Sequence, residues 1–389
     1  MLRAGVGCSI ALNPRTAAAE ATAEAMSRAG LSEAAGALCF ATTAHGAAFP
    51  IILRTVAAQA RTREVAGCSS VGVIATEQEI ESGPALAVLV FGGEELAARR
   101  FFVPSLRGRP REAAAEVAAA VRPALGPTNL LCLFPDTYNI EPETFLSTLR
   151  QELPGVTLAG GGATEDGSIG ETFQFCGDVV SSNAVSGMLL SGNFAVDVGA
   201  SSACTQIGPL HEVTAVRDNV LISLDGRPAW EVFAEAAGPL ADDFRRALAF
   251  VFLGIPLDPA AERLERGRHL VRNIVGASAE HGVLAVSHQF KAGDRMGLML
   301  RNAPGAREDL KTVLEEMRSR VRRPPALGLY FDCASRGSGL YNLPGHDCAY
   351  IQRYLGPLAL GGFFTGFEIG PLGRVSGILQ CSGVLVLIS

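Results

Sequence analysis

The chain has 389 residues, of which 48% are hydrophobic and 19% are charged, so it can bury a large core and is not intrinsically disordered. Its formal net charge of −6 argues against nucleic acid as the main partner, because phosphate binding needs a basic surface. At about 150 residues per domain, the length predicts two or three domains.

No segment has the character of an exported leader or a membrane anchor. Residues 1–26 hold no uninterrupted apolar run of the length that a secretion signal needs. Residues 375–388 are the most apolar end segment, but a spanning helix needs about 20 apolar residues, so this segment predicts buried strands. The nine cysteines are never spaced as C-x-x-C, which fits neither a disulfide framework nor a zinc site. We expect a cytoplasmic protein without membrane contact.

A unit of strand, helix, glycine-rich strand and closing strand recurs along the chain. In the first copy these parts are residues 37–40, 49–60, 66–70 and 86–91, and in the second they are residues 130–134, 143–152, 159–162 and 185–190. Cys39 and Cys132 lie 93 positions apart, and so do Gly67 and Gly160. The equal spacing predicts that the two copies fold alike.

A third, looser copy follows near the end of the chain, over residues 327–331, 349–355, 361–364 and 384–388. The short apolar runs between residues 244 and 300 are the candidate for a worn fourth copy. Short apolar strands mixed with helices predict an α/β (or α+β) protein, in which repeated strand-helix-strand units form layered sheets covered by helices.

Composition predicts where this fold divides into two modules. Residues 229–253 form a long helical region, and residues 257–268 are rich in charge and follow a proline, which is typical of a linker. We therefore place the boundary between the modules near residue 230. Residues 1–30 then form an N-terminal extension, and the modules cover residues 31–230 and 231–389.

Two loops of the third copy are the first candidates for a ligand site. Residues 332–339 follow a strand end and hold Arg336, whose guanidinium suits a carboxylate. Residues 361–370 hold Glu368 in an apolar surround, where a charge needs a partner such as Arg336, Arg374 or a ligand amine. We hypothesise that Arg336 and Glu368 bind opposite ends of a small zwitterion. The alternatives are a loop in which Arg336 pairs with a nearby acid and a structural ion pair for Glu368.

The glycine-rich turns of the first two copies are a second candidate. Residues 67–70 and 159–163 lie at matching points of their copies, and such turns can cradle an anion through backbone amides. The alternative is that their glycines serve the close packing of the repeats. We expect the glycine corners of successive copies to converge on a common hollow.

An enzyme that uses a cysteine is the alternative to a ligand-binding protein. The six histidines form no H-x-x-x-H pair, so no metal site is indicated. An enzyme that uses Cys333 or Cys68 as its nucleophile is an alternative, since a neighbouring guanidinium such as that of Arg336 lowers a thiol pKa. His346, close to Cys348 in the chain, is a weaker candidate for a Cys–His pair.

Five segments, in this order and spacing, resemble the FIST-domain family. They are residues 65–74 with Glu79 and Glu81, residues 199–208 with Thr214 and residues 219–228, residues 300–302 with residues 308–310, residues 331–337, and residues 362–370. The resemblance spans most of residues 31–389. It implies a FIST N-terminal module over residues 31–230 and a FIST C-terminal module over residues 231–389.

The resemblance also implies a function: a sensory or ligand-binding protein of bacterial signal transduction that binds an amino-acid-like molecule and acts through a signalling partner. Some relatives bind haem, for which His45 or His288 would be the iron ligand here. This chain has Phe367 where the family often has Gly and Gln380 where it often has His, so we predict no cofactor. The ligand-binding residues that we expect are Cys68, Ser69, Ser70, Cys333, Ser335, Arg336, Gly337, Gly362, Phe363 and Glu368.

Overall fold

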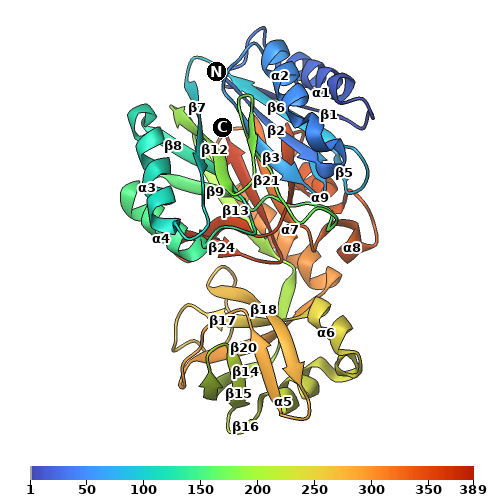
Figure 1. Cartoon of the computed structure of the whole chain (residues 1–389), viewed down its shortest axis with the longest axis vertical. Coiled ribbons are helices and arrows are strands. Elements are labelled where there is room, and N and C mark those ends of the chain that lie inside the picture. The colour runs from blue at the N-terminus through green and yellow to red at the C-terminus, as the bar shows by residue number, and fades with distance from the viewer. Residues whose placement is uncertain (1) are drawn as a thin grey trace.

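The protein has a large body and a smaller lobe, which lies below the body in Figure 1. The structure, a computed structural model, describes residues 2–389. Three six-stranded sheets form the body from residues 2–202 and 303–389, and one seven-stranded sheet forms the lobe from the inserted residues 203–302. The sheets of the body mix parallel and antiparallel pairs and carry helices, which is the α/β class that the sequence predicts.

The body repeats one order of elements three times: strand, helix, strand, helix, glycine-containing strand, two-stranded hairpin and closing strand. The first unit comprises β1 (Arg3–Ser9), α1 (Pro14–Ala29), β2 (Gly36–Thr42), η1 (Thr43–Ala48), α2 (Phe49–Ala60), β3 (Val65–Ser70), β4 (Val73–Ala75), β5 (Gln78–Ile80) and β6 (Leu86–Gly92). The second comprises β7 (Leu96–Pro104), α3 (Pro110–Val121), η2 (Arg122–Ala124), β8 (Thr128–Pro135), α4 (Pro142–Glu152), β9 (Thr157–Gly161), β10 (Gln174–Cys176), β11 (Val179–Ser181) and β12 (Ala184–Gly192). The third comprises β13 (Val196–Ser202), α7 (Ala303–Arg320), β21 (Leu327–Cys333), α8 (Gly337–Tyr341), α9 (His346–Leu355), β22 (Leu360–Thr365), β23 (Glu368–Leu372), β24 (Val375–Leu379) and β25 (Ser382–Ile388).

Each sheet of the body combines four strands of one unit with the hairpin of another. The strand orders are β1-β6-β2-β3 followed by β10-β11, β7-β12-β8-β9 followed by β23-β24, and β13-β25-β21-β22 followed by β4-β5. Within each unit, the glycine-containing strand pairs parallel with the strand before it, whereas the hairpin strand pairs antiparallel with a strand of the neighbouring unit. The exchange of hairpins therefore ties all three units into one body.

One glycine in each unit allows the parallel strands to come together. A Cβ atom on Gly67 would lie 1.8 Å from the carbonyl oxygen of Cys39, and a Cβ atom on Gly362 would lie 1.7 Å from that of Tyr330. Gly160 stands in the same relation to Leu133, at 2.1 Å. Each carbonyl belongs to the residue opposite the glycine in the parallel register. The glycine turns therefore serve close packing of the repeats rather than cradling an anion.

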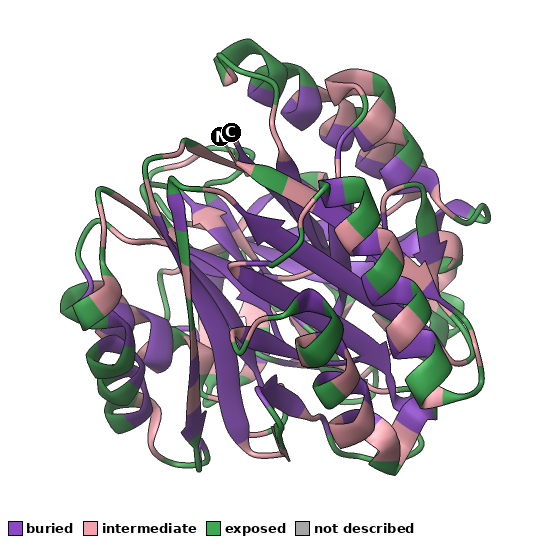
Figure 2. Cartoon of the chain, turned by 90° about the horizontal axis from the view of Figure 1, so that it is seen from above, coloured by how far each residue is buried: buried purple, intermediate pink, exposed green. Residues whose placement is uncertain are grey.

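Phenylalanine rings fill the centre where the three sheets meet. The Phe363 ring stacks on Phe40 with centroids 4.6 Å apart and lies 5.8 Å from both Phe134 and Phe331. All four rings are fully buried, and Figure 2 shows the strands as a buried interior with helices around them. The hypothesis of a common hollow between the glycine corners is therefore wrong. Phe363 is a core residue and not a ligand contact.

The lobe has a different fold, in which every strand pair is antiparallel. It comprises β14 (Cys204–Arg217), β15 (Val220–Leu224), β16 (Arg227–Pro228), α5 (Ala229–Ala237), η3 (Gly238–Asp242), α6 (Phe244–Phe250), β17 (Val251–Pro256), β18 (His269–Ser278), β19 (Val283–Val286) and β20 (Arg295–Arg301). The sheet order is β14-β20-β17-β18-β19-β15-β16. The expected worn fourth copy is therefore wrong, because this region has neither parallel pairing nor the order of elements of the units.

The body and the lobe do not coincide with the two modules that the sequence predicts. Residue 230 lies in α5, and strands from both sides of it share the single sheet of the lobe. Residues 1–30, taken as an extension, supply β1 and α1 within the described residues, and β1 pairs with β6 along its whole length. Residues 375–388 form β24 and β25, as predicted. Within residues 2–389, no helix is long and apolar enough to cross a membrane.

The close approach at Gly362 predicts a large loss of stability on substitution. Gly362→Ala should lower the free energy of unfolding by more than about 2 kcal/mol, because the added methyl group meets a backbone carbonyl that cannot rotate away. The control is Gly339→Ala in α8, where a Cβ atom meets nothing within 4 Å. Urea unfolding of both variants tests this. A Gly362→Ala protein as stable as wild type would contradict the role of this glycine.

Candidate functional site

The guanidinium of Arg336 pairs with two acids inside the protein through its Nε and Nη2 atoms, whereas its buried Nη1 atom has no hydrogen-bond partner within residues 2–389. Its Nε atom lies 2.8 Å from Oδ1 of Asp332, and its Nη2 atom lies 2.6 Å from Oδ2 of Asp347. Nη2 also donates to the Tyr341 hydroxyl at 2.9 Å, and the Tyr330 hydroxyl donates to Asp347 at 2.8 Å. Arg336 and both acids are buried. The loop after β21 is thus held by pairing with nearby acids, which was the alternative to a carboxylate clamp.

Glu368 is held by hydroxyl groups rather than by a cation. Thr365 Oγ1 donates to one carboxyl oxygen at 2.6 Å, and Ser382 Oγ donates to the other at 2.5 Å. Burial, and then the neighbouring Cys333, raise the pKa of Glu368 well above its usual range, which favours a neutral carboxyl group. Arg336 and Glu368 therefore do not present opposite charges to a ligand, and the zwitterion hypothesis is corrected.

The candidate nucleophiles lie in environments that disfavour a thiolate. A hydrogen bond with Cys381, and then burial, raise the pKa of Cys333 well above its usual value, and they outweigh the opposite effect of Ser335 Oγ, which donates to its sulfur at 3.1 Å. Burial raises the pKa of Cys68 in the same direction. A reactive cysteine needs the opposite shift, because the thiolate is the nucleophile. The expectation that Arg336 activates Cys333 is wrong, since that guanidinium faces Asp332 and Asp347.

The remaining predicted site residues hold the backbone together. Ser69 Oγ donates to the carbonyl of Thr164 at 3.1 Å, and Ser70 Oγ donates to the carbonyl of Phe364 at 2.9 Å, which joins the three units. Gly337 has a φ of +59°, and a Cβ atom there would lie 2.6 Å from the carboxylate of Glu81. Sequence signals of glycine and small polar residues therefore marked interior packing rather than a ligand site.

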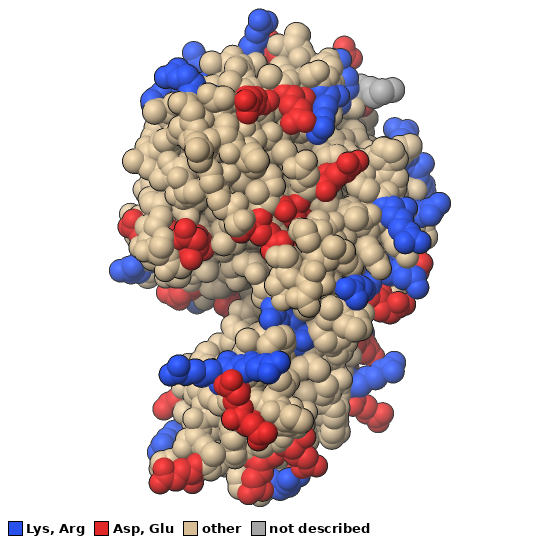
Figure 3. Space-filling view, turned by 90° about the vertical axis from the view of Figure 1, so that its right-hand side faces the viewer, with Lys and Arg blue, Asp and Glu red and all other residues tan. Residues whose placement is uncertain are grey.

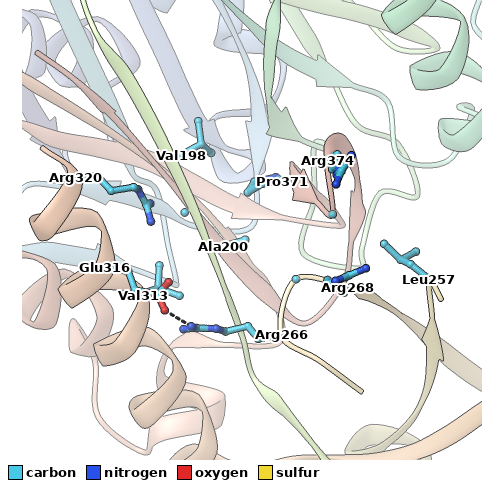
Figure 4. Close-up of a pocket in the computed structure, with 13 residues that line it drawn as sticks. Val198, Ala200, Leu257, Arg266, Arg268, Val313, Glu316, Arg320, Pro371 and Arg374 are labelled. Atoms are coloured by element: carbon cyan, nitrogen blue, oxygen red, sulfur yellow. Dashed lines mark hydrogen bonds and ion pairs between the residues drawn. The ribbon is translucent and has the colours of Figure 1, made fainter. Parts of the chain in front are cut away.

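A cavity of about 590 Å³ lies where the body meets the lobe (Figure 4). We call this space the waist cleft. Its body side comes from β13, α7 and the β23–β24 hairpin, and its lobe side comes from the loop between β17 and β18. Its charged lining residues are Arg266, Arg268, Glu316, Arg320 and Arg374. Figure 3 shows the narrowing between body and lobe, with Lys and Arg side chains along it.

A second arm of the waist cleft, of about 460 Å³, lies entirely within the body. It runs between the end of α4 and the β23–β24 hairpin, and its lining includes Arg150, Val156, Leu158 and Val375. The two arms share Val198, Pro371, Gly373 and Arg374. Five arginines therefore line these two adjoining spaces, against the single acidic lining residue Glu316.

The arginines of the cleft differ in how far carboxylates within the protein neutralise them. Arg320 forms a two-pronged pair with Asp197, at 3.0 Å, and Arg266 pairs with Glu316. Arg268 lies 3.7 Å from the exposed carboxylate of Glu265.

Two of the cleft arginines have no carboxylate partner. Arg150 donates only to the backbone carbonyl of Ser376, at 2.6 Å, and Arg374 makes no hydrogen bond or ion pair with any of residues 2–389. These two guanidinium groups can therefore bind an anion from outside.

A tight turn places Arg374 in the cleft. Gly373 has a φ of +62°, a conformation that glycine adopts without strain, and it turns β23 into β24. Its amide donates to the carbonyl of Gly267 in the lobe at 2.7 Å. The turn therefore touches the loop of residues 257–268, which we had predicted as a linker. This loop is in fact the lobe's side of the cleft.

Sequence reasoning named Arg374 only as a candidate partner of Glu368, which pairs with hydroxyl groups instead, and missed the other cleft arginines because nothing local distinguishes them. Only two of the 33 basic residues are lysines, so arginine is common everywhere in the chain. The Arg-Gly-Arg sequence at residues 266–268 and the Gly-Arg pair at residues 373–374 were the available signals. Both lie at turns, where a guanidinium next to glycine has space to reach a ligand.

The two candidate iron ligands lie away from the cleft. His45 is buried in η1 of the first unit, and His288 belongs to the lobe, where its ring packs edge-on against Phe290 at 4.6 Å. Neither residue lines either arm of the waist cleft.

The buried acids around Arg336 predict a dependence of stability on pH. Burial, and then the negative charge of Asp347, raise the pKa of Glu79 to about 7. The folded state thus binds a proton that the unfolded state has released, so this group's contribution to stability is lost as pH rises from about 4.5 to about 7. Glu79→Gln removes this loss and keeps an acceptor for the Cys348 amide, which now donates to Glu79 at 2.8 Å.

Urea unfolding at pH 5 and pH 8 measures this effect. Between these values, wild type should lose up to about 3 kcal/mol of unfolding free energy relative to Glu79→Gln. The exposed Glu33→Gln is the control and should follow wild type. Parallel curves for wild type and Glu79→Gln would contradict the raised pKa.

Comparisons with known proteins place the chain in a family. A FIST N domain matches residues 36–227, and a FIST C domain matches residues 229–371. An uncharacterized protein of Mycobacterium tuberculosis (strain CDC 1551 / Oshkosh) is 29% identical, and one of Mycobacterium bovis (strain ATCC BAA-935 / AF2122/97) is 27% identical, each over 95% of both chains.

Among solved structures, a cyanuic acid hydrolase from A. caulinodans matches 49% of this chain and 70% of its own, with 11% identity and a TM-score of 0.30, too low to carry an argument. The two domain matches together cover most of the chain, in the order and at the positions where the sequence motifs resemble the family. The chain therefore belongs to the FIST family.

Proposed function

We propose that this protein is a signal-transduction sensor that binds a small anionic molecule in the waist cleft and passes the signal to a partner protein. FIST domains are associated with sensing in signal transduction. The observation that carries the proposal is the convergence of five arginines on two adjoining cavities, because two of these arginines, Arg150 and Arg374, have no carboxylate partner within residues 2–389. An amino acid with an acidic side chain is the simplest ligand of this kind.

The size and chemistry of the cleft support binding of a small molecule. Ligand pockets commonly enclose about 300–1,000 Å³, and each arm falls in this range. A guanidinium group offers several donors in a fixed fork, which matches the two oxygens of a carboxylate. Arg150 is half-buried, and an unneutralised arginine in such a partly apolar site gains more from an anion than a fully exposed arginine does.

The position of the cleft supports a signalling role. Residues of both matched domains line it, because Arg150 and Val198 lie in the FIST N match and Arg266 and Arg320 lie in the FIST C match. The chain passes between the body and the lobe twice, between β13 and β14 and between β20 and α7. A ligand that binds both sides therefore favours one position of the lobe, which a partner protein can recognise.

The alternatives from the sequence have no comparable support. The cysteine enzyme would need a low thiol pKa, whereas burial raises the pKa of Cys68 and a hydrogen bond with Cys381 raises that of Cys333. The haem sensor would need an iron ligand in a cavity, and His45 and His288 line neither arm of the cleft.

Arg374→Ala tests the proposed function. In titration calorimetry with a panel of amino acids, wild type should bind glutamate and aspartate more tightly than neutral amino acids and more tightly than lysine. Arg374→Ala should weaken the acidic ligands about tenfold or more, because charge-assisted hydrogen bonds contribute about 1.5–3 kcal/mol. The matched control is Arg15→Ala, which removes an exposed arginine from α1. Equal affinities of wild type and Arg374→Ala for every binding amino acid would contradict the proposal.

A further inference from the structure

We infer that the protein has a second binding site, which takes an amphiphile with one aliphatic chain and one anionic head group, of which a fatty acid is the simplest form. The site is a cavity of about 940 Å³ in the body. It lies beside both chain ends, which Figure 1 and Figure 2 show close together on the side of the body away from the lobe. We call it the end cavity. The inference goes beyond the proposed function, because it concerns another cavity and another class of ligand.

All three units of the body line the end cavity, at the points where their first strands begin. Leu2 directly precedes β1, Leu96 is the first residue of β7, and Val196 is the first residue of β13. The loop between α7 and β21 forms a further wall. Ser389 also lines the cavity and is held by two backbone hydrogen bonds with Ala195, of 2.8 and 3.0 Å. The cavity is therefore a feature of the repeat and not of the inserted lobe.

The inner wall of the end cavity is apolar. Leu96 is buried in the same core cluster as the four central phenylalanine rings. Leu2, Phe194 and Val196 pack against this cluster. These three side chains are only half-buried, as is that of Val321, so they keep apolar surface that a ligand can cover. An aliphatic chain that enters the cavity removes this surface from water, which favours binding.

Unneutralised positive charge lies at the mouth of the end cavity. Arg322 and Arg323 both line it and are exposed, and neither makes a hydrogen bond or an ion pair with any of residues 2–389. Arg320 also lines it, but Asp197 occupies this guanidinium at 3.0 Å. With Glu95, two acidic side chains stand against three arginines in the lining. An anionic head group can therefore bind at the mouth, where it stays partly hydrated and avoids the cost of burying a charge.

The combination of an apolar wall and a cationic mouth selects the class of ligand. A small polar anion would leave the apolar wall uncovered, and a neutral hydrocarbon would leave both free arginines without a partner. A cationic amphiphile would meet these arginines with like charge. An anionic amphiphile satisfies both parts of the cavity, whose volume is within the range of about 300–1,000 Å³ that ligand pockets commonly have.

Titration calorimetry with hexanoate, octanoate and decanoate, each below the concentration at which it forms micelles, tests the ligand class. Wild type should bind decanoate most tightly, with an affinity that rises about threefold to fourfold for each added methylene group. Decyltrimethylammonium, which has a ten-carbon chain and a cationic head group, should bind at least tenfold more weakly than decanoate. Equal affinities for hexanoate and decanoate, or for decanoate and decyltrimethylammonium, would overturn the inference.

A double variant, Arg322→Gln with Arg323→Gln, tests the position of the head group. It should weaken decanoate about threefold to tenfold, because ion pairs with exposed arginines contribute modestly. The charge-matched control is Arg15→Gln with Arg111→Gln, which removes two exposed arginines that line neither the end cavity nor the waist cleft. This control should bind decanoate as wild type does. Thermal melting of each variant confirms that it is folded before titration.

The outcomes separate the end cavity from the proposed function. Within residues 2–389, the end cavity and the waist cleft share Arg320 as their one common lining residue. Arg374→Ala should therefore leave the affinity for decanoate unchanged, and the double variant should leave the affinity for glutamate unchanged. If the double variant binds decanoate as wild type does, or if wild type binds no fatty acid, the end cavity is wrong as a ligand site. The proposed function is decided by the amino acids alone.

Discussion

The packing of Phe363 against Phe40, Phe134 and Phe331 is the contact on which the organisation of the body depends. These rings come from all three sheets, and they can meet because a glycine in each unit lets the parallel strands approach each other's carbonyl groups. The centre of the repeat is thereby closed to ligands. The basic spaces at the waist lie outside this shared core.

The exchange of hairpins connects this core to the site. Because β23 and β24 leave the third unit and join the sheet of the second, the turn at residues 373–374 comes to lie beside Arg150 of α4. The same turn contacts Gly267 of the inserted lobe. The exchange of hairpins that holds the three units together thus also brings arginines from three distant parts of the chain to the waist cleft.

The sequence predicted the repeat and the fold class because both leave local traces. The spacing of 93 residues between Gly67 and Gly160 reflects the close strand pairing, which no other residue type allows. The partners of Arg336 and Glu368, by contrast, depend on where Asp347 and Ser382 arrive in three dimensions. The exchange of hairpins and the arginines that it gathers have no local signature, so the cleft appears only in the structure.

A crystal structure of the protein with saturating glutamate tests the central claim most directly. The account predicts glutamate in the waist cleft, with a carboxylate on Arg150 or Arg374. An empty waist cleft, or a glutamate carboxylate on Arg336, would contradict it.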